Sequence, residues 1–157
     1  MFQPKRILVP MDFSDEAQLA LDWAVMLAGQ TTGGSVFPIY IFSILPDTAA
    51  LDVGRSDYKN VTEAWVKDNM RKLEDRLPDH VSCVPVCGRG NPANEIVDIC
   101  RLKGIDLIVM TTHGRKGISH LLHTSVAEEL VRLASCPVLV LHMNRVNVET
   151  VHKPLTR

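Results

Sequence analysis

Short apolar runs alternate with amphipathic stretches along most of the chain. The apolar runs predict five strands, at residues 5–10, 36–44, 80–86, 106–111 and 137–142. The stretches between them predict four helices, at residues 14–31, 58–77, 91–104 and 125–134. In the first helix, one apolar stripe follows helical spacing: Ala17, Ala20, Leu21, Ala24, Leu27 and Ala28.

Several residues predict where these elements begin, end or break. Pro38 lies inside the second predicted strand, and because proline cannot donate to a ladder we expect a bulge there or a later strand start. Residues 88–91 are expected to form a turn, and 46–57 and 112–124 to form loops. Asn91 is the expected N-cap of the third helix and Gly104 its C-cap. In the second helix, the predicted apolar side consists of Val61, Trp65, Leu73 and Leu77.

The alternation predicts the α/β class, with a parallel sheet and helices on both faces. Each crossover is expected to be right-handed. No internal repeat or domain boundary is evident, so residues 1–142 are expected to form one domain. Residues 143–157 carry few apolar side chains and are expected to form a C-terminal tail.

Composition narrows the function classes. Lys and Arg number 17 against 18 Asp and Glu, which argues against a general nucleic-acid binder and a polybasic membrane anchor. No apolar run approaches the roughly 18 residues of a membrane span, and the N-terminal run is too short for a signal peptide. The four cysteines form no C-x-x-C pair, so we expect free thiols that pack as small core residues in a reducing cytoplasm.

Candidate chemistry follows the first and fourth predicted strands, because open α/β sheets bind ligands at the carboxyl ends of their strands. The first strand leads into Asp12, and the fourth leads into a loop with two glycines that reaches a helix start at Ser125. Such a helix start favours an anion, and Arg115 and Lys116 would add charge. Two alternatives remain: Ser125 only caps its helix, in a capping box with Glu128, and Asp12 only caps a turn.

Four segments of the chain resemble the universal stress protein family. They are residues 7–14, 88–93, 106–122 and 136–140, and they follow the family's order and spacing. The resemblance implies an open, twisted, Rossmann-like sheet of the adenine-nucleotide alpha-hydrolase type, with five parallel strands in the order 3-2-1-4-5. It also implies a homodimer built through the last strand, at Val138, Leu139, Val140 and Leu141.

Many members of this family bind ATP through the pattern Gly-x2-Gly-x9-Gly-Ser/Thr. Here Gly114 and Ser125 match the pattern, whereas Thr111 and Thr124 stand in place of glycines. A threonine at the third glycine position would be strained if the backbone there needs a positive φ, and would crowd a phosphate if close approach is needed. The resemblance places ATP, with Mg²⁺ only alongside it, against these residues: Pro10, Met11, Asp12, Ile41, Met110, Thr111, Gly114, Arg115, Thr124, Ser125 and Val126.

Two other arrangements carry less support. His113, His120 and His123 lie close in sequence, but the loop holds no carboxylate and does not follow a known zinc spacing. Ser125, His113 and Asp12 lack the G-x-S-x-G context of a nucleophile. No catalytic residue is assigned, and slow ATP hydrolysis is the most that the sequence supports.

The last predicted strand would be an apolar sheet edge, which pairing with a second subunit would cover. Residues 143–157 could cover it instead. The sequence therefore predicts a dimeric, cytoplasmic stress-response or signalling module that binds ATP as a conformational ligand. The alternatives are a protein-interaction module without nucleotide, favoured by Thr124, and an enzyme such as a nucleotide hydrolase or adenylyl transferase.

Overall fold

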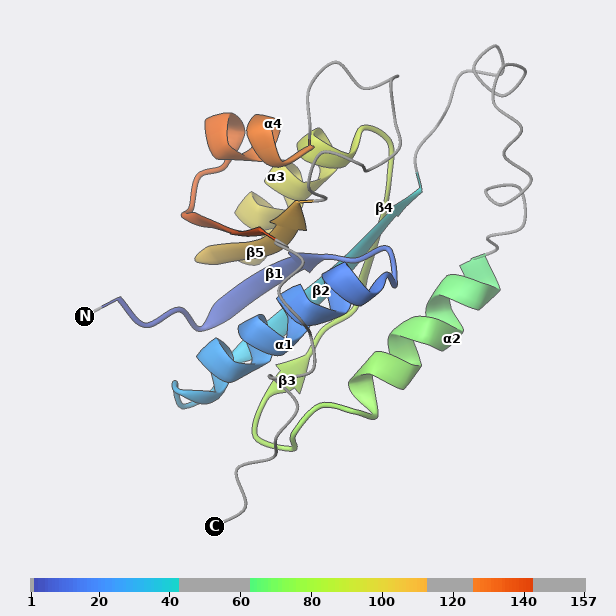
Figure 1. The fold of residues 1–157 in the computed structure, drawn as a ribbon, viewed down its shortest axis with the longest axis vertical. Coiled ribbons are helices and arrows are strands. Elements are labelled where there is room, and N and C mark those ends of the chain that lie inside the picture. The colour runs from blue at the N-terminus through green and yellow to red at the C-terminus, as the bar shows by residue number, and fades with distance from the viewer. Residues whose placement is uncertain (1, 43–62, 113–125, 143–157) are drawn as a thin grey trace.

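A parallel sheet runs through the middle of the protein, with helices on both of its faces (Figure 1). The computed structural model describes residues 2–42, 63–112 and 126–142. Its elements are β1 (Arg6–Pro10), α1 (Asp15–Gly29), β2 (Ser35–Phe42), α2 (Glu63–Glu74), β3 (Ser82–Cys83), β4 (Val86–Arg89), α3 (Pro92–Lys103), β5 (Leu107–Thr112), α4 (Val126–Leu133) and β6 (Val138–His142).

The strand order is β3-β2-β1-β5-β6, and β4 pairs with β2 as well. Every strand pairing is parallel. The predicted α/β class is therefore confirmed. The predicted order of strands also holds, once β3 and β4 are taken together as the third predicted strand.

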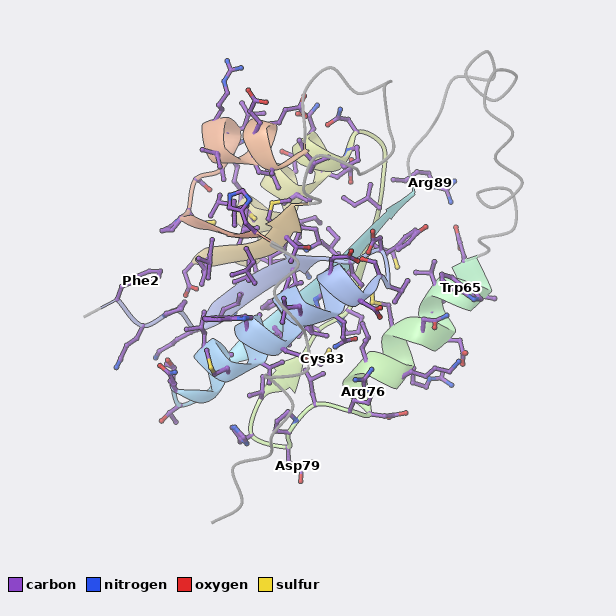
Figure 2. All side chains as sticks on the ribbon, viewed as in Figure 1. Phe2, Trp65, Arg76, Asp79, Cys83 and Arg89 are labelled. Atoms are coloured by element: carbon purple, nitrogen blue, oxygen red, sulfur yellow. The ribbon has the colours of Figure 1, made fainter. Side chains whose placement is uncertain are left out.

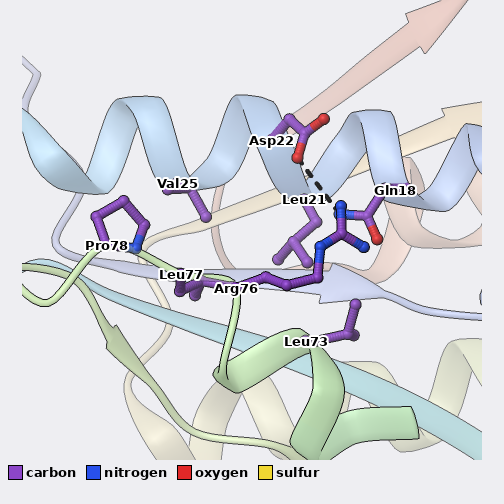
Figure 3. A pocket seen from close by; sticks show the side chains of 8 residues that line it. All are labelled: Gln18, Leu21, Asp22, Val25, Leu73, Arg76, Leu77 and Pro78. Carbon is purple, nitrogen blue, oxygen red and sulfur yellow. Dashed lines mark hydrogen bonds between the residues drawn. The ribbon is translucent and has the colours of Figure 1, made fainter.

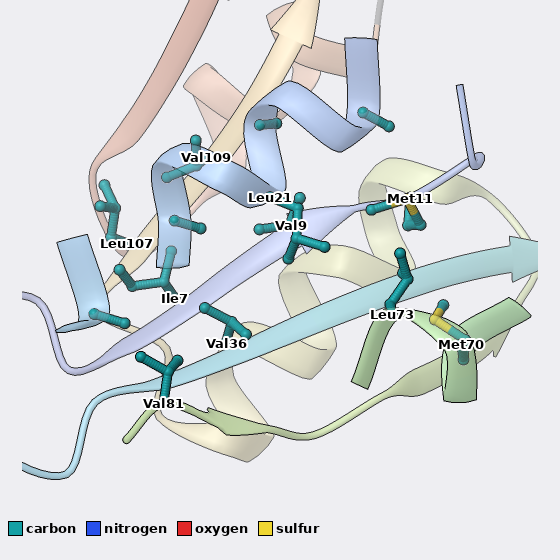
Figure 4. Close-up of a cluster of buried hydrophobic side chains, with 14 of the residues drawn as sticks. Ile7, Val9, Met11, Leu21, Val36, Met70, Leu73, Val81, Leu107 and Val109 are labelled. Carbon is teal, nitrogen blue, oxygen red and sulfur yellow. The ribbon is translucent and has the colours of Figure 1, made fainter. Parts of the chain in front are cut away.

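Successive side chains of each central strand enter opposite core layers, because strand side chains alternate between faces. Ile7 and Val9 pack beneath α1 and α2 in the first core layer, the cluster that Figure 4 shows. Leu8, between them, packs with α3 and α4 in the second core layer, on the other face of the sheet. Both faces of β1 are thus buried, which explains its continuous apolar run.

Pro38 explains why the third predicted strand is interrupted. β3 and β4 pair with β2 in one continuous register, in which Ser82 and Val84 donate to the Gly34 and Val36 carbonyl oxygens. Pro38 has no N–H to donate to the next carbonyl oxygen, that of Val84, so the ladder lapses between β3 and β4. The expected bulge or later strand start at Pro38 was wrong, because β2 begins at Ser35 and passes through Pro38 in register with Val9. The expected turn at 88–91 was also placed too early, since β4 continues to Arg89.

Helix ends follow the predicted caps. The Asn91 side chain accepts a hydrogen bond from the Asn94 N–H at the start of α3, and Gly104 ends that helix in the left-handed conformation. The predicted face of α2 was partly wrong: its buried residues are Val66, Met70 and Leu73. Trp65 is instead 44% exposed, and Val61 lies outside the described residues.

The cysteines are all free, as predicted, but they are not all core residues. Cys100 is buried, and burial raises the pKa of its thiol to about 12. Burial also raises the pKa of the half-buried Cys83 to about 11. Cys87 is exposed, although it lies on the α2 side of β4, where it lines a cleft with Glu63 and Lys67.

Candidate functional site

The carboxyl ends of β1, β2 and β5 meet at one edge of the sheet. Pro10, the last residue of β1, pairs with Ile39 of β2. Continuing the β1–β5 register by two residues places Pro10 level with Met110. The predicted residues of the first and fourth strands are therefore brought together at this edge.

Asp12 lies in the turn that joins β1 to α1. One oxygen of its carboxylate, Oδ1, accepts hydrogen bonds from the backbone N–H (2.9 Å) and the hydroxyl of Ser14. The Ser14 Oγ in turn accepts from the N–H of Ala17, 3.2 Å away, and so caps α1. Asp12 thus does support the turn, yet its side chain is exposed. Its second oxygen, Oδ2, accepts no hydrogen bond from the described residues.

The other predicted site residues differ in accessibility. The side chains of Met11 and Met110 are buried, in the first and second core layers respectively. Pro10, Ile41, Thr111 and Val126 are half-buried at the edge. Further predicted residues lie outside the described residues: Gly114, Arg115, Lys116, Thr124, Ser125 and the three histidines His113, His120 and His123.

An aromatic cluster beside Asp12 was not predicted from the sequence. The Phe13 ring stacks on Tyr40 of β2, with ring centroids 5.6 Å apart. It also meets the Trp65 ring of α2 edge-on, at 5.2 Å. The chain has 2 tryptophans, 2 tyrosines and 4 phenylalanines, and one of each meets here. The available signal was Phe13 itself, which directly follows the candidate Asp12.

The Glu95 side chain packs against two glycines at the end of β4, and the second of them, Gly90, has a φ of +138° that favours glycine. A Cβ on Gly88 would lie 3.1 Å from Glu95 Oε2, and a Cβ on Gly90 would lie 3.4 Å from Glu95 Oε1. Between these glycines, Arg89 donates to Glu63 Oε1 at 2.7 Å, which ties β4 to the first residue of α2. Figure 2 shows Arg89 and Trp65 at this same end of the molecule.

Two clefts lie near α2. The first is small and lies between the start of α2 and β4, lined by Glu63, Lys67, Cys87, Gly88 and Arg89. The second lies between the middle of α1 and the end of α2, and no predicted site residue lines it. Figure 3 shows its side chains, with Gln18 donating to Asp22 at 3.3 Å: Gln18, Leu21, Asp22, Val25, Leu73, Arg76, Leu77 and Pro78.

Two kinds of site are not found in the described part of the chain. Across residues 2–42, 63–112 and 126–142, no three His, Cys, Asp or Glu side chains are grouped to hold a metal ion. Within the same ranges, no helix has the length and apolar character needed to cross a membrane.

Comparison with known proteins identifies the family. The model of the universal stress protein family matches residues 4–142. This chain belongs to the universal stress protein family. Universal stress protein MJ0531 of Methanocaldococcus jannaschii is 31% identical over 140 residues, which are 87% of this chain and 81% of that protein.

Solved structures agree with this membership. The universal stress protein UspA from Lactobacillus plantarum is 28% identical, with a TM-score of 0.71 over 90% of this chain and 99% of that one. A universal stress protein in complex with cAMP shares the fold at 21% identity, with a TM-score of 0.64 over 91% of this chain and 100% of that one. An Arabidopsis thaliana family member with AMP bound shares it at 17% identity, with a TM-score of 0.57 over 90% and 94% of the two chains.

In this universal stress protein, β6 lies at the end of the strand order and pairs with β5. Leu139 and Leu141 pack against the first core layer, and Val138 and Val140 against the second. All four side chains are half-buried, so the apolar surface of β6 is incompletely covered by the described residues.

Proposed function

We propose that this universal stress protein is a stress-response module that binds ATP as a conformational ligand at the carboxyl ends of β1, β2 and β5. The observation that carries the proposal is the exposed Asp12 carboxylate at that edge. The turn holds its Oδ1, while Oδ2 accepts no hydrogen bond from the described residues. An anchored carboxylate of this kind suits a hydroxyl donor such as a ribose.

The structures with bound cAMP and AMP support an adenine nucleotide as the ligand class. Residues at this edge fit such a ligand: Pro10 and Ile41 offer half-buried apolar surface beside the polar Asp12. Mg²⁺ would accompany ATP, since it is usually held by phosphates and one or two carboxylates. Bound ATP would shift a conformational equilibrium by its difference in affinity between two states.

Thr111, one of the two departures from the glycine pattern, is compatible with this proposal. In the described part of the chain, Phe13 is the one non-glycine residue with a positive φ. Thr111 lies within β5, and its φ is not positive. A β-branched residue suits such an extended backbone. Thr124 lies outside the described residues, so its effect is left to experiment.

The proposal includes a homodimer that pairs the β6 edges of two copies. The half-buried side chains Val138, Leu139, Val140 and Leu141 would lose their remaining exposure in that pairing. Sedimentation showing a monomer at micromolar concentration would contradict this part of the proposal.

The test of nucleotide binding is calorimetric titration with ATP and Mg²⁺, after bound nucleotide has been removed by mild unfolding and refolding. We expect a dissociation constant in the micromolar range, and loss of binding in Gly114→Val, whose side chain would occupy the phosphate loop. If wild type releases no nucleotide on unfolding and gives no heat with millimolar ATP, the protein is instead an interaction module without nucleotide.

A further inference from the structure

Phe13 adopts a backbone conformation that its side chain disfavours. Its φ is +63°, in the left-handed region that bulky residues rarely enter. Such a conformation persists when the surrounding contacts impose it. The residue directly follows Asp12, so whatever holds Phe13 also determines where the Asp12 carboxylate lies.

Contacts from three elements hold Phe13 in place. On the backbone side, Asp12 and Ser14 are joined across it by the hydrogen bond from the Ser14 N–H to Asp12 Oδ1. On the side-chain side, Tyr40 of β2 stacks on its ring with an interplanar angle of 20°. The Trp65 ring of α2 meets the Phe13 ring edge-on, with an interplanar angle of 87°.

The contact from α2 links this turn to a separate helix. Trp65 belongs to the first turn of α2, and Glu63 in the same turn is paired with Arg89 at the end of β4. Deeper in α2, the buried Val66, Met70 and Leu73 anchor the helix in the first core layer. The first turn of α2 is therefore fixed to the edge of the sheet where ATP is proposed to bind.

We propose that Phe13, held between Tyr40 and Trp65, is a positioning residue that orients the Asp12 carboxylate toward the nucleotide. It contacts Asp12 through the backbone and need not touch the ligand. This inference rests on the proposed function. It adds that α2 contributes to nucleotide affinity through a ring contact, although none of the predicted ligand residues lies on α2.

A matched pair of tryptophan variants tests the proposal. Trp65 and Trp23 are 44% and 42% exposed, but Trp23 lies on α1 and is not part of the ring cluster. Trp65→Ala and Trp23→Ala therefore remove similar surface. We expect Trp65→Ala to weaken ATP binding about threefold to tenfold, since an aromatic pair contributes roughly that factor. We expect Trp23→Ala to keep the wild-type dissociation constant, and we expect Trp65→Ala to lower the melting temperature more than Trp23→Ala, because it also loses the ring pair with Phe13.

A second pair of variants addresses Phe13 directly. Phe13→Ala removes both ring contacts and is expected to weaken ATP binding about tenfold or more. Phe13→Tyr retains a ring and is expected to bind ATP with wild-type affinity. If Phe13→Ala fails to fold, the tryptophan pair still decides the question. Equal ATP affinity in Trp65→Ala and Trp23→Ala, with wild type binding ATP, would overturn this inference and leave the proposed function standing. Absence of binding by wild type would overturn both.

Discussion

Replacing Gly34 with alanine is expected to lower the free energy of unfolding by about 3 kcal/mol or more, since a large steric clash with backbone is among the most destabilising changes. A Cβ on Gly34 would lie 2.0 Å from the carbonyl oxygen of Ala28 and 2.6 Å from its carbonyl carbon. Because both atoms belong to the backbone at the end of α1, no side-chain rotation can relieve the clash.

In Gly34→Ala the backbone around residue 34 has to shift. Hydrogen bonds of this backbone join β1, β2 and β3, so the shift disturbs all three strands. The neighbouring Ser35 N–H donates to the Lys5 carbonyl oxygen at 2.7 Å, just before β1, and the Ser82 N–H of β3 donates to the Gly34 carbonyl oxygen at 3.1 Å. Urea denaturation monitored by circular dichroism measures the loss. The matched control is Gly33→Ala, where φ is +76° and no atom lies within 4 Å of the added Cβ. That variant should cost about 1 kcal/mol, from the left-handed conformation alone. Equal losses in the two variants would contradict the packing described at Gly34.

Replacing Asp12 with alanine is expected to weaken ATP binding about tenfold to a hundredfold. A hydrogen bond to a charged group contributes about 1.5–3 kcal/mol, which corresponds to that range of dissociation constants. The same change removes the acceptor of the Ser14 N–H, so a moderate loss of stability is expected beside it. Calorimetric titration and thermal unfolding of the same samples separate the two effects.

Asp12→Asn is the control for the turn. Its side-chain oxygen can still accept from the Ser14 N–H, but the negative charge is gone. We expect this variant to keep most of the wild-type stability while binding ATP more weakly than wild type. Wild-type ATP affinity in both Asp12 variants would show that Asp12 serves the turn and not a ligand.

The parts of the fold that depend on local signals could be predicted from the sequence. Asn91 and Gly104 end α3 as predicted, because caps depend on side chains within a few residues. The interruption between β3 and β4 could not be predicted from local pattern, because it depends on Pro38 in the neighbouring strand β2. Trp65 was assigned to the wrong side of α2 because residue spacing alone does not decide which stripe of a helix faces the core.

The candidate site likewise combines a feature that the sequence predicts with features that it does not. The position of Asp12 at the carboxyl edge follows from the strand pattern, since the ends of parallel strands share one edge. The left-handed conformation of Phe13 and its contacts with Tyr40 and Trp65 come from three elements far apart in sequence. No local pattern encodes such a cluster, so it could be found only in the folded structure.

Hydrogen–deuterium exchange with and without ATP tests most directly whether the nucleotide binds at the carboxyl ends of β1 and β5. The account predicts slower exchange at residues 11–15 and in the first turn of α4, both of which lie at that edge. It predicts no change at residues 5–6, at the opposite end of β1. Unchanged exchange throughout, or slowing confined to the cleft between α1 and α2 at residues 18–25 and 73–78, would contradict it.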